Sequence, residues 1–274
     1  MTNSDAKIAE MFTAGAHFGY SKASRHSSIQ DSVFGTKDGV QVIDLEKTAA
    51  QLEFAQEAVR NLTVNGGKII FVGSKNEAKD VVKEAARELG MPYVNTRWIG
   101  GTLTNYSEIK KRINKLAKMM TDREKGEYDK YNKKEQLDLD KEIEKLQKHY
   151  TGLLTMSELP KALIVVDSKS EHIAVKEASD MNIPVISISN TDCNIKLVSH
   201  PIVANDGASA SIAYFITQLK ESFTKGDAKE VKKEAKTDTK APIKKTEAKD
   251  PVKTETKETK TEEKKDTEVE TKTK

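Results

Sequence analysis

Short apolar runs alternate with amphipathic helical segments in this chain, and this alternation limits the fold more than any other feature. Gly67–Val72 and Ala162–Val166 are typical of strands that are buried on both faces. Each run is followed by a polar turn and by apolar residues at helical spacing, Asn76–Leu89 in one case and a segment through Asp180 in the other. Such strands occur in parallel sheets that helices cover on both sides. We therefore predict an α/β fold with a doubly wound, mostly parallel sheet of the Rossmann or flavodoxin-like type.

The remaining segments fit the same plan, apart from Ser21–Ser32, which is polar and irregular. Further strands are predicted at Gly39–Leu45, Met91–Val94, Ile183–Ile188 and Val198–Ala204. Further helices are predicted at Ser4–Ala14, Glu46–Thr63 and Asp206–Phe223.

A different pattern separates the two halves of the predicted sheet. Apolar residues recur at steps of three and four in two stretches, first Ile109, Ile113, Leu116 and Met120, then Leu139, Ile143, Leu146 and Tyr150. Gly126 breaks the pattern between them. Two helices with such seams, joined by a short polar loop, predict an antiparallel coiled hairpin inserted at about residues 103–157.

Charge is distributed unevenly along the chain. Residues 224–274 contain 16 lysines and 13 acidic residues and no aromatic residue, which leaves equal numbers of basic and acidic residues in the first 223. The net charge of +3 therefore belongs to the C-terminal segment and cannot argue for nucleic-acid binding by the rest. We predict an α/β domain over residues 1–223 and a disordered tail over residues 224–274, where too little apolar surface offsets chain entropy.

Several classes of protein are disfavoured by simple counts. Cys193 is the only cysteine, so a disulfide framework or a multi-cysteine zinc site within the chain is excluded, and a reducing compartment is expected. The first ten residues have no cationic stretch followed by an apolar run, and no apolar segment approaches the ~20 residues that span a bilayer. We expect a cytoplasmic protein without a signal peptide or a membrane partner.

The turn Gly73–Lys75 lies between a predicted strand and a predicted helix, where α/β proteins bind phosphate. It lacks the second glycine and the Gly-Lys-Ser/Thr ending of a phosphate loop, and it lacks the three spaced glycines of a dinucleotide site. An ordinary tight turn explains it better, although Lys75 could meet an RNA phosphate. An enzyme that acts on a sugar phosphate or nucleotide stays the alternative.

Other residues with reactive side chains have simpler explanations. Asp167 and Glu171 flank a strand–helix turn, where acidic residues stabilise the helix dipole. Glu177 is expected to be a surface or buffering charge, and Cys193 an incidental loop thiol. We expect no catalytic residue, no cofactor, no metal site and no small-molecule substrate.

Two segments have the composition of RNA-binding loops. Ala14–Tyr20, with Lys22 and Arg25 close behind, combines glycines, aromatic residues and cations, and His17 within it suits hydrogen bonding or stacking. Thr96–Tyr106 contains Arg97, the only tryptophan, Trp98, and a double glycine. Small residues allow the backbone close to a phosphate, and arginine offers a planar donor fork. A purely structural role, with Trp98 in the core and the glycines allowing a bend in the chain, is an equally good alternative.

Five blocks, in order and spacing together, resemble the family of bacterial small-subunit ribosomal protein two. They are Ala14–Gly19 (Ala-Gly-Ala-His-Phe-Gly), Phe34–Thr48, Gly66–Lys75, Asn95–Asn105 and Leu159–Asp167, the last continuing through Glu171–Ala178 to Asn182–Val185. The resemblance covers roughly Ser4 to Phe223. The chain departs from the family pattern after Gly19, at Thr96, where histidine is usual, at Tyr106, where tryptophan is common, and at Cys193–Ser199, which lacks an Asp-Pro turn.

The resemblance implies a Rossmann-like layer with a helical hairpin, bound to small-subunit ribosomal RNA, and no catalytic activity. It also implies neighbouring small-subunit proteins as partners, including ribosomal protein one, which the chain would help to dock. We predict a structural, ribosome-bound protein whose candidate RNA-binding residues are His17, Lys22, Arg25, Lys75, Arg97, Trp98, Lys110, Lys111 and Arg112. A cytosolic adaptor that grips protein partners with its hairpin and tail is a third, weaker hypothesis.

Overall fold

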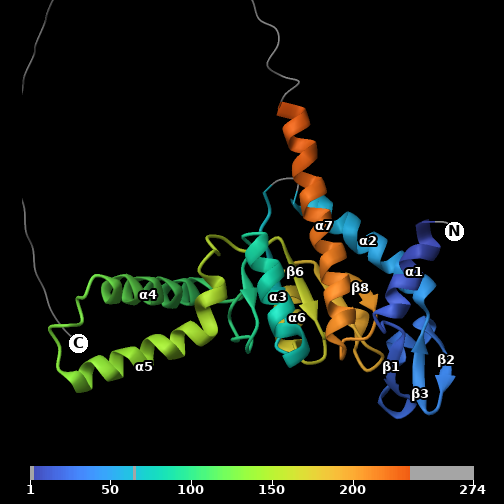
Figure 1. Cartoon of the computed structure of the whole chain (residues 1–274), viewed down its shortest axis with the longest axis horizontal. Helices are drawn as coiled ribbons and strands as arrows, with labels where there is room; N and C mark the ends of the chain where they lie inside the picture. The colour runs from blue at the N-terminus through green and yellow to red at the C-terminus, as the bar shows by residue number, and fades with distance from the viewer. Residues whose placement is uncertain (1–2, 64–65, 235–274) are drawn as a thin grey trace, which may run out of the picture. The chain divides into compact units, whose positions relative to one another are not determined.

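The computed structural model describes residues 3–63 and 66–234, all within one compact unit of the chain (Figure 1). A five-stranded sheet has the order β5-β4-β6-β7-β8, and every neighbouring pair is parallel. Its strands are β4 (Ile69–Val72), β5 (Tyr93–Val94), β6 (Ala162–Val166), β7 (Val185–Ser189) and β8 (His200–Val203). Counted in chain order this is the flavodoxin-like order 2-1-3-4-5, whose switch point lies between β4 and β6. The predicted fold class is confirmed.

Helices cover both faces of this sheet because its central strands are apolar on both sides. Ile69, Phe71 and Ile164 face one way and pack with helices α2, α3 and α7. Ile70 and Leu163 face the other way and pack with α4, α5 and α6. The helices are α1 (Asn3–Thr13), α2 (Leu45–Thr63), α3 (Asn76–Glu88), α4 (Tyr106–Glu124), α5 (Lys133–Tyr150), α6 (His172–Asp180) and α7 (Ser209–Glu234). Short 3-10 turns occupy Lys22–Ser24, Ser27–Ser32, Thr151–Leu153 and Ile195–Leu197.

A second, antiparallel sheet lies near the N-terminus, where we predicted one strand. Its order is β1-β3-β2, with β1 at Phe18–Ser21, β2 at Val33–Lys37 and β3 at Val40–Ile43. A two-residue turn joins β2 to β3, since Lys37 pairs with Val40 and both Asp38 and Gly39 have positive φ, 51° and 80°. Asp-Gly between two such strands is a strong hairpin signal, and the prediction of a single strand here is incomplete.

Helices α4 and α5 lie side by side as a helical hairpin (Figure 1). Both are longer than the predicted periodic segments, and the ion pairs Lys115–Glu142 and Arg123–Asp140 cross between them. Met119 is more buried in their contact than the predicted Met120, which packs at its margin. The boundaries of the insertion, 103–157, stay a prediction.

Helix α7 extends to Glu234, although we expected it to end at Phe223 and disorder to begin at residue 224. The boundary of the predicted tail stays a prediction, and residues 235–274 lie outside the described residues. Among the helices of the described ranges, none has the length and apolarity that crossing a bilayer requires.

Gly152 tests the packing that joins the end of the hairpin to the sheet. A Cβ at this position would lie 2.1 Å from the Tyr93 carbonyl oxygen and 2.8 Å from the Tyr93 ring. Gly152→Ala should therefore lower the free energy of unfolding by about 2–3 kcal/mol, measured by urea denaturation. Gly35→Ala is the control, because nothing lies within 4 Å of a Cβ there. Equal stability of the two variants would contradict this packing.

Candidate nucleic-acid interface

A buried charge cluster lies at the carboxyl edge of the parallel sheet, on the switch point. Lys75 follows β4, Asp167 follows β6 and Asp206 follows β8. The Lys75 Nζ lies 2.8 Å from Asp167 Oδ2 and 2.7 Å from Asp206 Oδ2. Both aspartates are buried, so one ammonium ion joins the ends of three strands. Tyr20 adds a tie to the N-terminal sheet, because its hydroxyl donates to Asp206 at 3.4 Å.

The cluster shifts the protonation of its members in different directions. Burial alone would raise the pKa of Asp167, but hydrogen bonds from Lys75 and Ser170 outweigh it and hold that pKa below its ordinary value. Burial raises the pKa of Asp206 despite its bond to Lys75. Burial opposes the charge of Lys75, yet hydrogen bonds to Asp167 and Asp206 raise its pKa overall. Lys75 is therefore a permanent cation at neutral pH.

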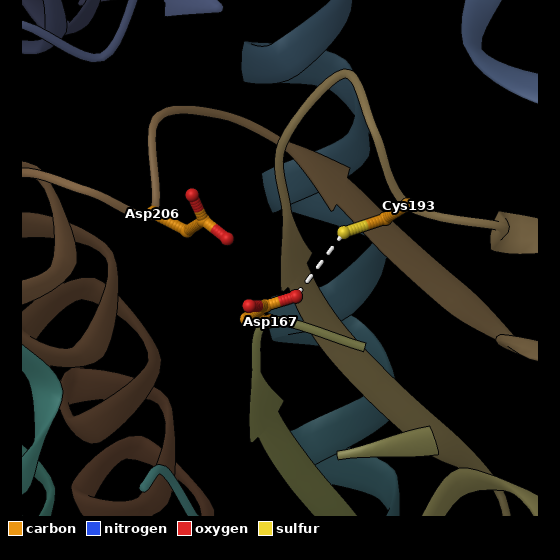
Figure 2. Close-up of side chains that lie close together, drawn as sticks. All are labelled: Asp167, Cys193 and Asp206. Atoms are coloured by element: carbon orange, nitrogen blue, oxygen red, sulfur yellow. Dashed lines mark hydrogen bonds between the residues drawn. The ribbon is translucent and has the colours of Figure 1, made fainter. Parts of the chain in front are cut away.

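Cys193 completes this cluster and is inert in it. Figure 2 shows its thiol pointing toward Asp167, to which the sulfur donates at 3.4 Å. Burial and the charge of Asp167 raise the pKa of the thiol to about 12, so it stays protonated and is a poor nucleophile. Ligand atoms of Asp167, Cys193 and Asp206 lie within 4.8 Å of one another, as in a metal site. Here the cation between the two carboxylates is the Lys75 ammonium.

The turn Gly73–Lys75 is closed to phosphate by its own hydrogen bonds. The Gly73 N–H donates to Val94 and the Ser74 N–H donates to the buried carboxylate of Glu171 at 3.1 Å. The charge of Lys75, which we predicted to lie near RNA, already has two carboxylate partners. Asp167 accepts the N–H groups of Lys169 and Ser170 in the turn that precedes α6, whose N-cap residue is Glu171. Its pairing with Lys75 was not foreseen.

Glu177 on α6 is buried, with 8% of its surface exposed, and the expectation of a surface charge is wrong. Its Oε1 accepts the indole N–H of Trp98 at 3.3 Å and the N–H of Gly101 at 2.7 Å. Its Oε2 accepts the N–H of Leu103 at 3.0 Å. The ring of Trp98 is itself buried in the core on that face of the sheet, which favours the structural alternative for this residue.

The predicted cations of this region lie on the surface around the loop that Glu177 holds. Arg97 is exposed, as are Lys110, Lys111 and Arg112 in the first half of α4. Lys110 lies 5.8 Å over the Tyr106 ring, and Lys111 pairs with Glu108 at 2.6 Å. Arg112 lines a hollow with Gly100, Gly101, Asn105 and Tyr150. The structure thus brings Arg112 to the glycine loop that follows Arg97.

The remaining candidates belong to the N-terminal segment. His17 stacks on Phe12, with ring centroids 4.3 Å apart and 9° between planes, and it contacts Phe18 at 4.0 Å. Burial lowers the pKa of His17, so it is neutral at physiological pH. Lys22 is exposed and Arg25 is half-buried, both near the 3-10 turn after β1.

Replacing Lys75 should lower the free energy of unfolding, because two buried carboxylates would lose their cation. We expect Lys75→Met to lower the free energy of unfolding by about 3 kcal/mol at neutral pH, because Asp167 and Asp206 lose their cation. Lys79→Met, on the next turn of α3, is the matched control, since Lys79 only donates to Asn76.

The deficit of Lys75→Met should shrink as pH falls. Without the ammonium ion the folded-state pKa values of both carboxyl groups rise above their unfolded values, so the folded state takes up protons first and gains stability on acidification. Urea denaturation at about pH 7 and about pH 5 measures this. A deficit that is the same at both pH values, or no larger than that of Lys79→Met, would contradict the assignment.

Comparison with known proteins identifies the family. The model of the family described as ribosomal protein S2 matches residues 11–226. Small ribosomal subunit protein uS2 of Francisella tularensis subsp. tularensis is 39% identical over 234 residues, 85% of this chain and 98% of that protein. The uS2 protein of Coprothermobacter proteolyticus is 38% identical over 219 residues, 80% of this chain and 82% of its own. With a family match over most of its length and relatives of 38–39% identity aligned over more than four fifths of their own length, this chain belongs to the ribosomal protein S2 family.

Proposed function

We propose that this chain holds small-subunit ribosomal RNA through Arg97 and the cations Lys110, Lys111 and Arg112, which a rigid loop and the start of α4 present together. As a member of its family the chain is a structural component of the small ribosomal subunit, acts in translation and is not an enzyme. The closed turn at Gly73–Lys75 agrees with setting aside the sugar-phosphate enzyme. The proposal concerns which residues bind the chain to the RNA of the small subunit.

The observation that carries the proposal is local clustering of cations on a neutral body. Arg97 and Arg112 form no ion pair within 4 Å of a described carboxylate, although Glu108 lines the same hollow as Arg112 and interacts with its charge. The Gly100–Gly101 backbone, three residues after Arg97 in the chain, lines the hollow beside Arg112 and lets a phosphate or sugar approach closely. Arginine binds phosphate bidentately, and each neutralised phosphate releases counterions. This arrangement supports positional binding of a folded RNA.

The other predicted contacts carry less weight in this proposal. His17, Lys22 and Arg25 form a second group on the N-terminal segment. Trp98 acts from inside, by fixing the loop. Contact between Lys75 and RNA stays a prediction, and the two carboxylate partners of Lys75 argue against its direct contact with a phosphate.

The exposed aromatic patch, Phe12, Phe18 and Phe34, is the surface that we propose for docking ribosomal protein one. These side chains are 61%, 53% and 81% exposed, and the His17 ring stacks on Phe12 and contacts the tilted ring of Phe18. Beside them is a hollow whose lining includes Phe12, His17, Phe34, Val42 and Leu45 together with the acidic residues Asp44 and Glu46. Clustered exposed aromatic residues mark protein interfaces, and acidic residues beside them disfavour RNA.

Arg97→Ala should weaken binding to small-subunit ribosomal RNA and reduce the slope of log affinity against log salt by about one. The physical reason is the loss of one phosphate contact. Binding over a salt series, with co-sedimentation on small subunits, is the measurement. Arg87→Ala, an exposed arginine at the end of α3, is the control. An unchanged slope in Arg97→Ala, or the same loss in both variants, would overturn this contact.

Phe34→Ser should reduce affinity for ribosomal protein one on small subunits by about thirtyfold, the ~2 kcal/mol typical of an aromatic anchor. Affinity for ribosomal RNA should stay unchanged, because the patch is distinct from the arginine loop. Phe54→Ser is the matched control, since Phe54 on α2 is 68% exposed. If both variants retain ribosomal protein one like the parent chain, the patch is not its docking surface.

A further inference from the structure

We infer that Glu177 is a positioning residue for RNA binding: its buried carboxylate acts as an internal anion around which the loop from Arg97 to Asn105 is built. This inference rests on the proposed function, because it concerns the loop that carries Arg97 to the RNA. Glu177 itself would not contact RNA, but it would set the geometry of Arg97 and the other cations that do.

Five donors converge on this one carboxylate. Besides the bonds of Trp98, Gly101 and Leu103, the N–H and the hydroxyl of Thr104 approach Oε2 at 3.4 and 3.5 Å. Three of the donors are consecutive or nearly consecutive backbone N–H groups, the arrangement that forms an anion-binding concavity in proteins. The concavity is filled by the chain's own glutamate.

Besides the bonds to Glu177 and the packing of Trp98 and Leu103 in the core, few hydrogen bonds hold the shape of the loop. Within it the Thr102 N–H donates to Ile99, the Asn105 N–H donates to Gly101, and the Thr102 hydroxyl donates to Ile99. Gly101 has a φ of +89°, a conformation that side chains disfavour. Without an acceptor at the position of Glu177, three loop N–H groups and the buried Trp98 indole would lose a hydrogen-bond partner.

Glu177 controls both ends of the cationic surface. Trp98, one of its donors, directly follows Arg97, and Thr104, another donor, comes two residues before α4 begins at Tyr106. A shift of the carboxylate would therefore move Arg97 relative to Arg112. Because only 8% of Glu177 is exposed, its negative charge is covered and does not face the RNA.

The charge and the reach of the side chain both matter. Hydrogen bonds to an ionised acceptor are about twice as strong as neutral ones. Glutamine would turn an NH₂ group toward donors, and aspartate would be one methylene too short to bridge Gly101 and Leu103. A scaffold built this way presents its cations in one geometry, which lowers the entropy lost on binding.

The test combines Glu177→Gln and Glu177→Asp with Arg97→Ala, the double variant Glu177→Gln/Arg97→Ala, and Asp180→Asn as the control. Asp180 lies on the same helix, is exposed, and loses the same charge. Amide hydrogen exchange is read for residues 98–104 and for β4 and β6. Affinity for small-subunit ribosomal RNA is measured over a salt series.

For Glu177→Gln we expect loop exchange to be faster by at least about tenfold with β4 and β6 still protected. RNA affinity should fall by about tenfold or more, at least as far as in Arg97→Ala. Arg97→Ala should cost much less in the Glu177→Gln background than alone, because the arginine is already misplaced there. Glu177→Asp should behave like Glu177→Gln, and Asp180→Asn like the parent chain.

Parent-like RNA affinity in Glu177→Gln or Glu177→Asp, while Arg97→Ala is weakened, would overturn the inference and leave the proposed function standing. Full additivity in the double variant would also overturn it, since Glu177 would then act only on stability. A parent chain without salt-dependent RNA binding would overturn both. If Glu177→Gln does not fold, Trp98→Phe removes one donor, and parent-like affinity and loop exchange in that variant would count against the inference.

Discussion

The central strands β4 and β6 are apolar on both faces, and the rest of the structure depends on this constraint. Ile69 and Phe71 face one layer of helices while Ile70 and Val72 face the other, so polar residues are confined to the ends of the strands and to the loops. The strands are parallel, so the residues that follow them meet at one edge. Lys75, Asp167 and Asp206 lie there, and their ion pairs close the edge.

Two buried carboxylate systems divide the work of this fold. At the sheet edge Asp167 and Asp206 are paired with Lys75, and these ion pairs hold the ends of three strands together. The cluster also occupies the place where α/β enzymes bind phosphate. On the opposite layer Glu177 has no cation among its hydrogen-bond donors and instead accepts five hydrogen bonds from one loop. The Lys75 cluster fills a site that could bind a phosphate ligand, and Glu177 fixes the loop that presents the proposed RNA-binding surface. This is why a fold shared with many enzymes suits a structural component of the small ribosomal subunit.

The regular elements of the large sheet could be predicted because burial on both faces leaves unbroken apolar runs such as Ala162–Val166, which β6 matches at both ends. Strands β1 and β2 were missed because they are short and mostly exposed, although the Asp38–Gly39 turn was a usable signal. Helix periodicity could have placed Glu177 on the inner face with Ala174 and Ala178, one turn away and adjacent. The pairing of Lys75 with Asp206 spans 131 residues and follows from strand order, which one sequence does not give.

The central claim is that cations gathered by a rigid loop and a helix start hold a folded RNA. A density map of the small ribosomal subunit with this chain bound tests it most directly. The account predicts the guanidinium groups of Arg97 and Arg112 within hydrogen-bonding distance of RNA phosphates, with the Gly100–Gly101 backbone against a nucleotide. Arg97 and the Lys110–Arg112 segment in open solvent, away from any nucleotide, would contradict it.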